Sequence, residues 1–174
     1  MIINGDNPED IVFTSLYDDS IGGDTSNNAT STSAVPGQFS GIYVSDTGSL
    51  KAKGFTMRYA GSGRYMGNNS AAVMTIGGDL DIANAIFSSN YPYGIYAENS
   101  QNIKIENSRF ENHNYLGPWG GGAALGIFNS AVVLNGIFFA NNILGVMSDT
   151  ISTFTSSIVD FIDNTATTSP PGLW

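Results

Sequence analysis

Two acidic residues have a spacing that could support hydrolysis of a glycosidic bond. The sequence contains a repeated pattern of residues. Glu98 and Asp149 fall at the same position of this repeat, two repeats apart, and we expect side chains at this position to point outward. If the repeats stack as neighbouring β-strands, the two side chains are separated by about 9.6 Å, near the upper limit for the acid and base of an inverting enzyme. We align Gly126 between them, and no third acidic residue joins the pair. The sequence therefore favours a chain without an active site and keeps this pair as weak catalytic candidates.

A row of aromatic side chains could bind carbohydrate. Tyr43 and Tyr96 occupy the same outward position of two repeats, and Tyr115 and Trp119 lie in a long insertion that we expect beside this face. Aromatic rings pack against the apolar faces of sugar rings, while hydroxyl groups supply hydrogen bonds. The alternative is that these aromatic residues cover one another and pack beneath the loops or the N-terminal segment.

An aspartate-rich segment could bind calcium. Asp18, Asp19 and Asp24 lie in a stretch that also contains Gly, Ser, Thr and Asn. Calcium prefers hard oxygen ligands of this kind, although the spacing of an EF-hand loop and its final Glu are missing. A structural calcium ion is one prediction, and a solvated turn held by side-chain-to-backbone hydrogen bonds is the other.

The composition limits the classes of protein to consider. With 174 residues and 41% hydrophobic residues, the chain can form one domain with a continuous core. Only 12% of residues are charged and 21 are Gly, which is typical of a turn-rich all-β protein. The formal charge of −9 disfavours nucleic acid and anionic lipid as partners. No apolar run approaches the length of a membrane span, and the absence of cysteine excludes disulfides and zinc–thiolate sites.

One phrase recurs five times, and it predicts how the chain folds. In the clearest copy, Ile95 and Ala97 alternate inward, Ile103 and Ile105 do the same, and Phe110 ends a third side. One copy has too few apolar residues to bury its own face, so the copies must stack. We therefore expect an all-β parallel β-helix of about five coils with three short strands per coil. The copies begin at Gly41, Ala72, Gly94, Gly122 and Gly145, and their last sides contain Met57, Phe87, Phe110, Phe138 and Phe161.

Asparagine recurs at one turn of the repeat. Asn84, Asn107 and Asn135 each stand three residues before an aromatic residue. A side-chain amide can donate to the coil above and accept from the coil below, so these residues predict an asparagine ladder within a buried turn. The single histidine, His113, falls where other coils have a turn asparagine, which favours a hydrogen-bonded turn residue over a general base or metal ligand.

A column of alternating charge provides a test of the repeat alignment. Lys51, Asp81 and Lys104 fall at the same outward position of three consecutive coils. Neighbouring strands lie about 4.8 Å apart, so we expect these side chains to be close together. Exposed pairs of this kind contribute at most about 1 kcal/mol each.

The chain resembles the right-handed parallel β-helix proteins of the pectate-lyase-like superfold. The resemblance rests on the repeat and on the opening segment, where residues 5–15 are followed by Asp18-Asp19, residues 22–25 and Pro36-Gly37. Where such proteins usually have Trp-Gly-Gly-Ile after the Pro-Gly, this chain has Phe39 to Ile42. The resemblance implies a right-handed coil and a secreted or surface-displayed bacterial protein, and it implies almost nothing about activity.

These observations lead to a functional expectation with one alternative. We expect residues 1–40 to form a partial coil and a polar loop, residues 41–166 the coils, and residues 167–174 a tail, in one domain excised from a longer protein. The expected function is that of a non-enzymatic extracellular module, either a rigid spacer or a domain that binds carbohydrate or a cell-surface partner. Neighbouring coils of a longer parent, or an end-to-end homo-oligomer, would cover its ends. The alternative is a fragment of a polysaccharide lyase or glycoside hydrolase.

Overall fold

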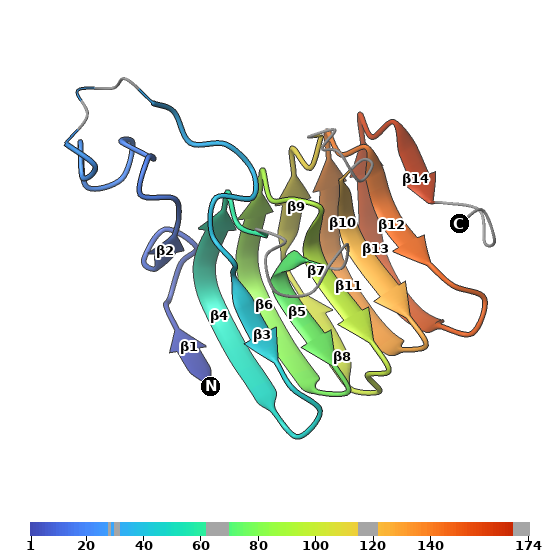
Figure 1. Cartoon of the computed structure of the whole chain (residues 1–174). Coiled ribbons are helices and arrows are strands. Elements are labelled where there is room, and N and C mark those ends of the chain that lie inside the picture. Colours follow the sequence, from blue (N-terminus) through green and yellow to red (C-terminus); the bar gives the residue numbers. More distant parts are fainter. Residues whose placement is uncertain (28, 30–31, 62–69, 115–121, 169–174) are drawn as a thin grey trace.

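The chain forms two parallel β-sheets that wind around a common axis (Figure 1). The computed structural model describes residues 1–27, 29, 32–61, 70–114 and 122–168. One sheet has eight strands in the order β1-β4-β6-β8-β11-β13, with β2 paired to β4 and β9 paired to β6 and β11; the other has six strands in the order β14-β12-β10-β7-β5-β3. Within the described ranges, no helix is long and apolar enough to cross a membrane. The strands are β1 (Ile2–Asn4), β2 (Val12–Phe13), β3 (Ile42–Val44), β4 (Ser49–Arg58), β5 (Ala71–Ile76), β6 (Asp79–Ser88), β7 (Tyr93–Glu98), β8 (Ile103–Glu106), β9 (Arg109–Glu111), β10 (Ala123–Phe128), β11 (Ala131–Ala140), β12 (Leu144–Ser148), β13 (Thr153–Ile162) and β14 (Ala166–Thr168).

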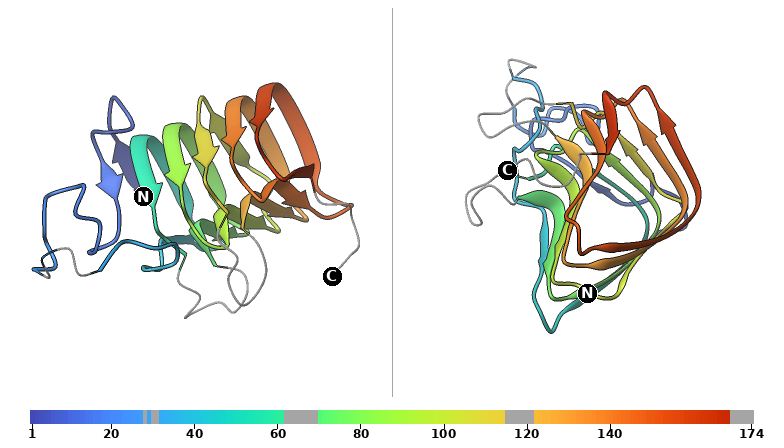
Figure 2. Two further views of the ribbon diagram at one scale, coloured as in Figure 1. Left: turned by 90° about the horizontal axis from the view of Figure 1, so that it is seen from above. Right: turned by 90° about the vertical axis from the view of Figure 1, so that its right-hand side faces the viewer.

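Each coil passes once through both sheets. A strand of the six-stranded sheet is followed by a tight turn and then by a longer path through the eight-stranded sheet (Figure 2). The complete coils are β3–β4, β5–β6, β7–β9, β10–β11 and β12–β13, while β1 and β2 add part of a coil at one end and β14 at the other. The predicted all-β parallel β-helix of about five coils is therefore confirmed.

The second and third sides of most coils are one bent strand. Strands β4, β6, β11 and β13 each run for 10 residues, whereas the third coil divides this path into β8 and β9. One residue with positive φ makes the bend, and the pairing of neighbouring coils continues on both sides of it. The bend residues form a column of Gly54, Asn84, Asn107, Gly136 and Ile158.

The other two corners use the same backbone conformation. After the first side, Gly77, Asn99 and Asn129 have positive φ in consecutive coils. After the third side, the corresponding column is Tyr59, Ser89, Asn112, Asn141 and Asp163. Glycine and asparagine tolerate the left-handed region better than most residues, which explains why they are abundant in this sequence.

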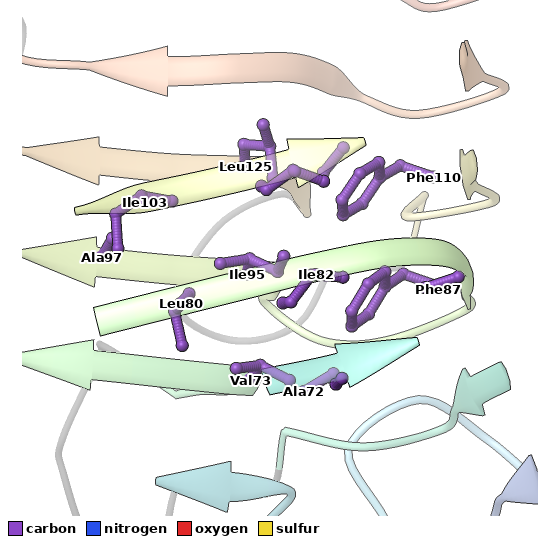
Figure 3. Packing of buried hydrophobic residues seen from close by; sticks show 14 of the residues in the cluster. Ala72, Val73, Leu80, Ile82, Phe87, Ile95, Ala97, Ile103, Phe110 and Leu125 are labelled. Atoms are coloured by element: carbon purple, nitrogen blue, oxygen red, sulfur yellow. The ribbon is translucent and has the colours of Figure 1, made fainter. Parts of the chain in front are cut away.

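A row of phenylalanine rings runs along the core (Figure 3). Phe87, Phe110 and Phe139 are each fully buried, and their rings stack with centroid separations of 4.9 and 5.4 Å. Phe161 extends the stack at 4.9 Å from Phe139. Burying one such side chain contributes about 1.5–3 kcal/mol, and neighbouring rings add about 0.5–1.5 kcal/mol per pair.

The register of the fourth coil differs from the sequence alignment. Ile95 pairs with Leu125, so the coil begins at Ala124 and not at Gly122. On the third side Phe110 pairs with Phe139, and Phe138 points outward beneath the guanidinium of Arg109. The alignment was wrong here because the segment offers several small residues in succession and then two adjacent phenylalanines, so the sequence pattern permits more than one register.

Candidate functional site

Glu98 and Asp149 lie on the outer face of the six-stranded sheet. Phe128 lies directly opposite Glu98, and the pairing of Ile127 with Ser148 places Asp149 on the other side of Phe128. The two carboxylates therefore share a column two coils apart, as expected. The residue between them is Phe128, which corrects the alignment of Gly126 at that position and follows from the register shift of the fourth coil.

Both carboxylates make hydrogen bonds within the fold. The hydroxyl of Tyr96 donates to Glu98 Oε2 at 2.8 Å. Asp149 accepts from the backbone N–H of Asn129 at 2.7 Å and from the hydroxyl and N–H of Ser152 at 2.5 and 2.9 Å. Partial desolvation acts to raise the pKa of Asp149, but these hydrogen bonds hold it below its usual range. A general acid needs a raised pKa, so the environment of Asp149 suits a turn-capping carboxylate.

The aromatic residues of this face pack mainly against one another. Tyr96 is only 4% exposed and packs with Met74 and with the rings of Tyr93 and Phe128, whose centroids lie 5.4 and 5.3 Å from its own. Burial, followed by the hydrogen bond to Glu98, raises the pKa of the Tyr96 hydroxyl far above its usual range. In this arrangement the Tyr96 ring has no open face for a sugar.

Of the other residues predicted to bind carbohydrate, one is accessible. Tyr43 is 51% exposed at the N-terminal end of the same column. Tyr115 and Trp119 lie outside the described residues. The described part of the face therefore offers a single exposed aromatic ring and a small, separate apolar cluster.

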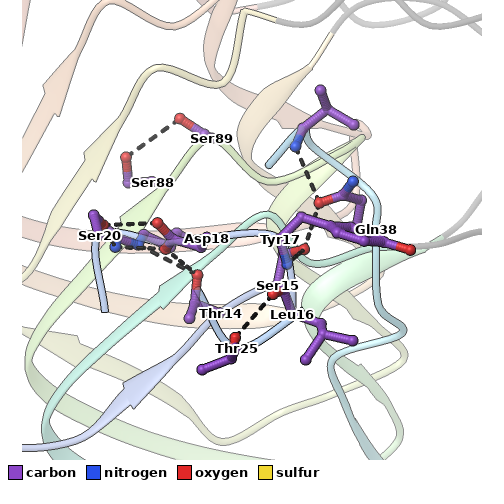
Figure 4. A network of polar contacts seen from close by, with 12 residues as sticks. Thr14, Ser15, Leu16, Tyr17, Asp18, Ser20, Thr25, Gln38, Ser88 and Ser89 are labelled. Carbon is purple, nitrogen blue, oxygen red and sulfur yellow. Dashed lines mark hydrogen bonds and ion pairs between the residues drawn. The ribbon is translucent and has the colours of Figure 1, made fainter. Parts of the chain in front are cut away.

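The aspartate-rich segment is fastened to the coils by an ion pair (Figure 4). Asp18 Oδ2 lies 2.5 Å from the guanidinium of Arg58 and also accepts from Thr14, while its Oδ1 accepts from Ser20 at 2.7 Å. Desolvation acts to raise the pKa of Asp18, but the hydrogen bonds and the charge of Arg58 lower it overall. Asp24 instead accepts from the N–H of Ala29. Among the residues that the structure describes, no three Asp, Glu or His side chains converge as a metal site.

The predicted asparagine ladder is only partly correct. Asn84 and Asn107 do occupy one column, at the bend between the second and third sides. Asn135 lies one position earlier and pairs with Glu106, so that Gly136 takes the bend. Asn84 donates to the backbone carbonyl of Asp6, and Asn107 is exposed. The common feature of this column is its positive φ and not a chain of amide hydrogen bonds.

A buried ladder exists at the end of the third side. His113 Nδ1 lies 2.9 Å from Asn142 Oδ1, and Asn142 Nδ2 donates to Asn164 Oδ1 at 2.8 Å. Asn90 continues the column, with Nδ2 3.5 Å from His113 Nε2. The side chains also satisfy backbone groups, since Asn90 accepts from Ala60 N–H and Asn142 donates to Phe110 O.

Histidine behaves as a member of this ladder. His113 is fully buried, and desolvation lowers its pKa to about 4 although the hydrogen bond to Asn142 acts in the opposite direction. It is therefore neutral at pH 7, as expected for a structural turn residue. The asparagine ladder predicted from the sequence did not include these residues. The sequence signal for them is a Phe-x-x-Asn or Phe-x-x-His spacing that begins at Phe87, Phe110, Phe139 and Phe161.

A groove runs across the eight-stranded sheet near the start of its long strands. Its volume is about 610 Å³. The column Lys51, Asp81 and Lys104 lies along it and has the predicted register, with Lys51 Nζ 3.7 Å from Asp81 Oδ2. Lys104 Nζ lies 2.7 Å from Glu106. Other lining residues include Gln101, Asn102, Ala131, Val133, Thr153 and Thr155. The groove thus combines balanced charge with neutral hydrogen-bonding groups, and no sequence pattern pointed to it.

Comparison with known proteins agrees with this geometry. A family model described as a right-handed beta helix region matches residues 40–169. No curated protein and no solved structure matches the chain. The matched residues include all five complete coils of stacked parallel strands. The chain therefore belongs to the right-handed β-helix family.

Proposed function

We propose that this chain is a rigid, non-catalytic β-helix module of an extracellular or surface protein. The observation that carries the proposal is that both candidate catalytic carboxylates are hydrogen-bonded to other residues of the fold. Glu98 accepts from the Tyr96 hydroxyl, and Asp149 caps a turn. Its hydrogen bonds lower the pKa of Asp149, which makes this carboxyl group a poor general acid. The structure thus favours a mechanical role over chemistry at this face.

Stacked pairing gives a physical basis for stiffness. Each inner coil hydrogen-bonds to a coil on either side, and the buried Asn90–His113–Asn142–Asn164 ladder joins four successive coils. A bend between two coils would stretch backbone hydrogen bonds and ladder bonds together. The module would therefore hold whatever lies at its two ends at a fixed separation.

Spin-label distances test the rigidity directly. The chain has no cysteine, so Lys51→Cys and Thr155→Cys give two unique labels on one outward column, four strand spacings apart. We expect a narrow distance distribution centred near 19 Å before the length of the label linkers is added. The same sample in urea provides the control. A broad distribution in buffer would contradict the spacer role.

An assay for catalysis tests the other half of the proposal. The chain is incubated with a panel of plant and microbial polysaccharides, and reducing ends and unsaturated products are measured. We expect no product. Product that disappears in Glu98→Gln and Asp149→Asn, with both variants folded, would overturn the proposal and favour a glycoside hydrolase or lyase.

The groove supports a second candidate function, the binding of a polar, uncharged glycan. Its lining of Gln101, Asn102 and Thr155 supplies hydrogen bonds, and the paired Lys51 and Asp81 leave little net charge. A thermal-shift screen against neutral polysaccharides tests it. A stabilising glycan should lose its effect in Asn102→Ala and keep it in Lys53→Ala, because Lys53 is outside the groove lining.

A further inference from the structure

The groove on the eight-stranded sheet has one aliphatic step in an otherwise polar lining. Ala131 and Val133 of β11 stand two residues apart on its outward face, and Val133 is 43% exposed. A ligand in the groove therefore meets one small apolar surface, formed by these two residues. The other aliphatic lining residues are only 1–2% exposed and belong to the core: Leu50, Leu80, Ile103 and Val132.

Polar side chains flank the aliphatic step on both neighbouring coils. On β13, Thr153 and Thr155 pair with the two residues of the step. On β8, Lys104 pairs with Val133, and Asn102 stands two residues before Lys104 on the same face of the sheet. Neighbouring strands lie about 4.8 Å apart, so a group placed on the step is close to polar side chains on either side.

These flanking side chains can form hydrogen bonds to a ligand. Asn102 Nδ2 donates to Asp79 Oδ1 at 2.9 Å, which leaves Asn102 Oδ1 as an acceptor. The Lys104 ammonium carries three N–H donors. The side chains of Thr153 and Thr155 are exposed, and each hydroxyl can both donate and accept. The step is thus bordered by donors and acceptors.

The charge of the lining is balanced. It contains two lysines, Lys51 and Lys104, and two aspartates, Asp79 and Asp81. Lys51 Nζ lies 3.7 Å from Asp81 Oδ2. A charged ligand of either sign would be attracted by one of these pairs and repelled by the other. The balance therefore favours a ligand without net charge.

An acetamido group matches both parts of this surface. Its methyl group is apolar, its N–H is a donor and its carbonyl is an acceptor. Asn102 Oδ1 can accept from the N–H, while Lys104 and Thr155 can donate to the carbonyl. A sugar without this group offers hydroxyls, and its apolar ring faces pack best against aromatic side chains. None of the described lining residues is aromatic.

We propose that the groove binds a neutral glycan through the N-acetyl groups of its amino sugars, with an acetamido methyl group against Ala131 and Val133. The sugar chain crosses the strands, as the groove does. The proposal rests on the glycan binding proposed above for the groove and deepens it, because it names the class of sugar. A glycan of unsubstituted hexoses shares the neutral charge but lacks the group that contacts the step.

Two matched tetrasaccharides provide the probe. Fully acetylated chitotetraose and cellotetraose have the same sugar backbone and linkage, and they differ only in the acetamido groups. Binding of each to the whole chain is measured by isothermal titration calorimetry. We expect the acetylated tetramer to bind at least about tenfold more tightly than cellotetraose, because its methyl group leaves water and its amide makes additional hydrogen bonds.

Two serine substitutions locate the acetamido group. Val133→Ser removes the larger part of the step, while Val35→Ser makes the same change at a residue that is 47% exposed and outside the groove lining. Val133→Ser should bring the two affinities to within about threefold of each other, and Val35→Ser should keep the preference of about tenfold. Circular dichroism establishes that both variants are folded; if Val133→Ser is not, Val133→Thr replaces it, since threonine keeps the branched shape and suits a strand.

Four results would overturn the proposal. Cellotetraose could bind as tightly as the acetylated tetramer, deacetylated chitotetraose could bind more tightly, Val35→Ser could reduce the preference as much as Val133→Ser does, or no tetramer could bind. In the first case, weaker binding of both tetramers to Asn102→Ala would retain the groove as a glycan site and reject only the acetamido assignment. Absence of all binding would reject the glycan site as well, and the rigid module would still be judged by its spin-label distances.

Discussion

Replacement of Phe139 by alanine tests the register of the fourth coil and the importance of the phenylalanine stack. The Phe139 ring is fully buried between Phe110 and Phe161, at centroid distances of 5.4 and 4.9 Å. Truncation of a buried phenylalanine costs about 3–5 kcal/mol, because transfer free energy is lost and a cavity remains. Loss of two ring pairs places this site in the upper half of that range. We expect Phe139→Ala to lower the free energy of unfolding by about 4 kcal/mol.

The adjacent phenylalanine is a matched control. Phe138 points outward and contacts the guanidinium of Arg109, 4.4 Å from its ring centroid. An exposed cation–π contact is worth about 0.5–1 kcal/mol, so Phe138→Ala should have a small effect. Urea unfolding followed by circular dichroism measures both variants, and with an m-value of about 2 kcal/mol/M the midpoints should differ by about 1.5 M. Equal midpoints, or a lower midpoint for Phe138→Ala, would refute the register.

Three further perturbations address the ladder and the N-terminal segment. Asn142→Ala removes donors to Phe110 O and Asn164 Oδ1 and leaves buried partners unsatisfied, so urea unfolding should show a loss of about 2–4 kcal/mol. The pKa of His113 is about 4 in the folded chain, below its ordinary 6.5, so the unfolded chain binds the extra proton and stability falls as pH drops from about 6.5 to 4; the loss integrates to about 3 kcal/mol. Arg58→Met leaves Asp18 without its cation, so limited proteolysis should cut the N-terminal segment faster.

Each of these perturbations has a control and a contradicting result. Asn135→Ala, which loses the bond from Ser157 and the bond to Glu106 at the surface, should cost less than about 1 kcal/mol; a cost equal to that of Asn142→Ala would argue against the ladder. His113→Asn should remove the additional loss between pH 6.5 and 4, and an unchanged pH profile would assign that loss to carboxylates. Arg109→Met is the control for Arg58→Met, since Arg109 pairs with Glu111 away from the N-terminal segment. Similar proteolysis of both variants would contradict a role for the Asp18–Arg58 ion pair in holding the N-terminal segment.

Much of the fold was predictable because its strongest signal is local and repeated. The inward alternation of Ile95, Ile103 and Ile105 defines one coil, and no single copy can bury its own apolar face. Stacking was therefore required by the sequence. The column of Lys51, Asp81 and Lys104 was also predicted correctly, because each of these residues stands between two inward apolar residues of its coil.

The fourth coil was ambiguous in the sequence for a physical reason. A shift of two residues keeps the inward and outward faces of a strand unchanged, so small residues on either side of Ala124 gave no preference between two starts. Phe138 and Phe139 are chemically identical, and the bend at Gly136 decides which of them points inward. The choice of Gly122 as the start placed Gly126 between the two acidic residues. The choice of Phe138 as the inward ring placed Asn135 in the predicted ladder.

The sequence by itself determined the parallel β-helix, its approximate number of coils and its acidic, cysteine-free character, because these follow from residue type and period. Only the tertiary structure decided which side chains are accessible. Tyr96 and Glu98 lie in the two outward columns that the sequence predicts. Neighbouring aromatic residues nevertheless bury the Tyr96 ring, and the Tyr96 hydroxyl donates a hydrogen bond to the Glu98 carboxylate. Hydrogen bonds and exposure depend on atoms from other coils, and period alone does not specify which atoms those are.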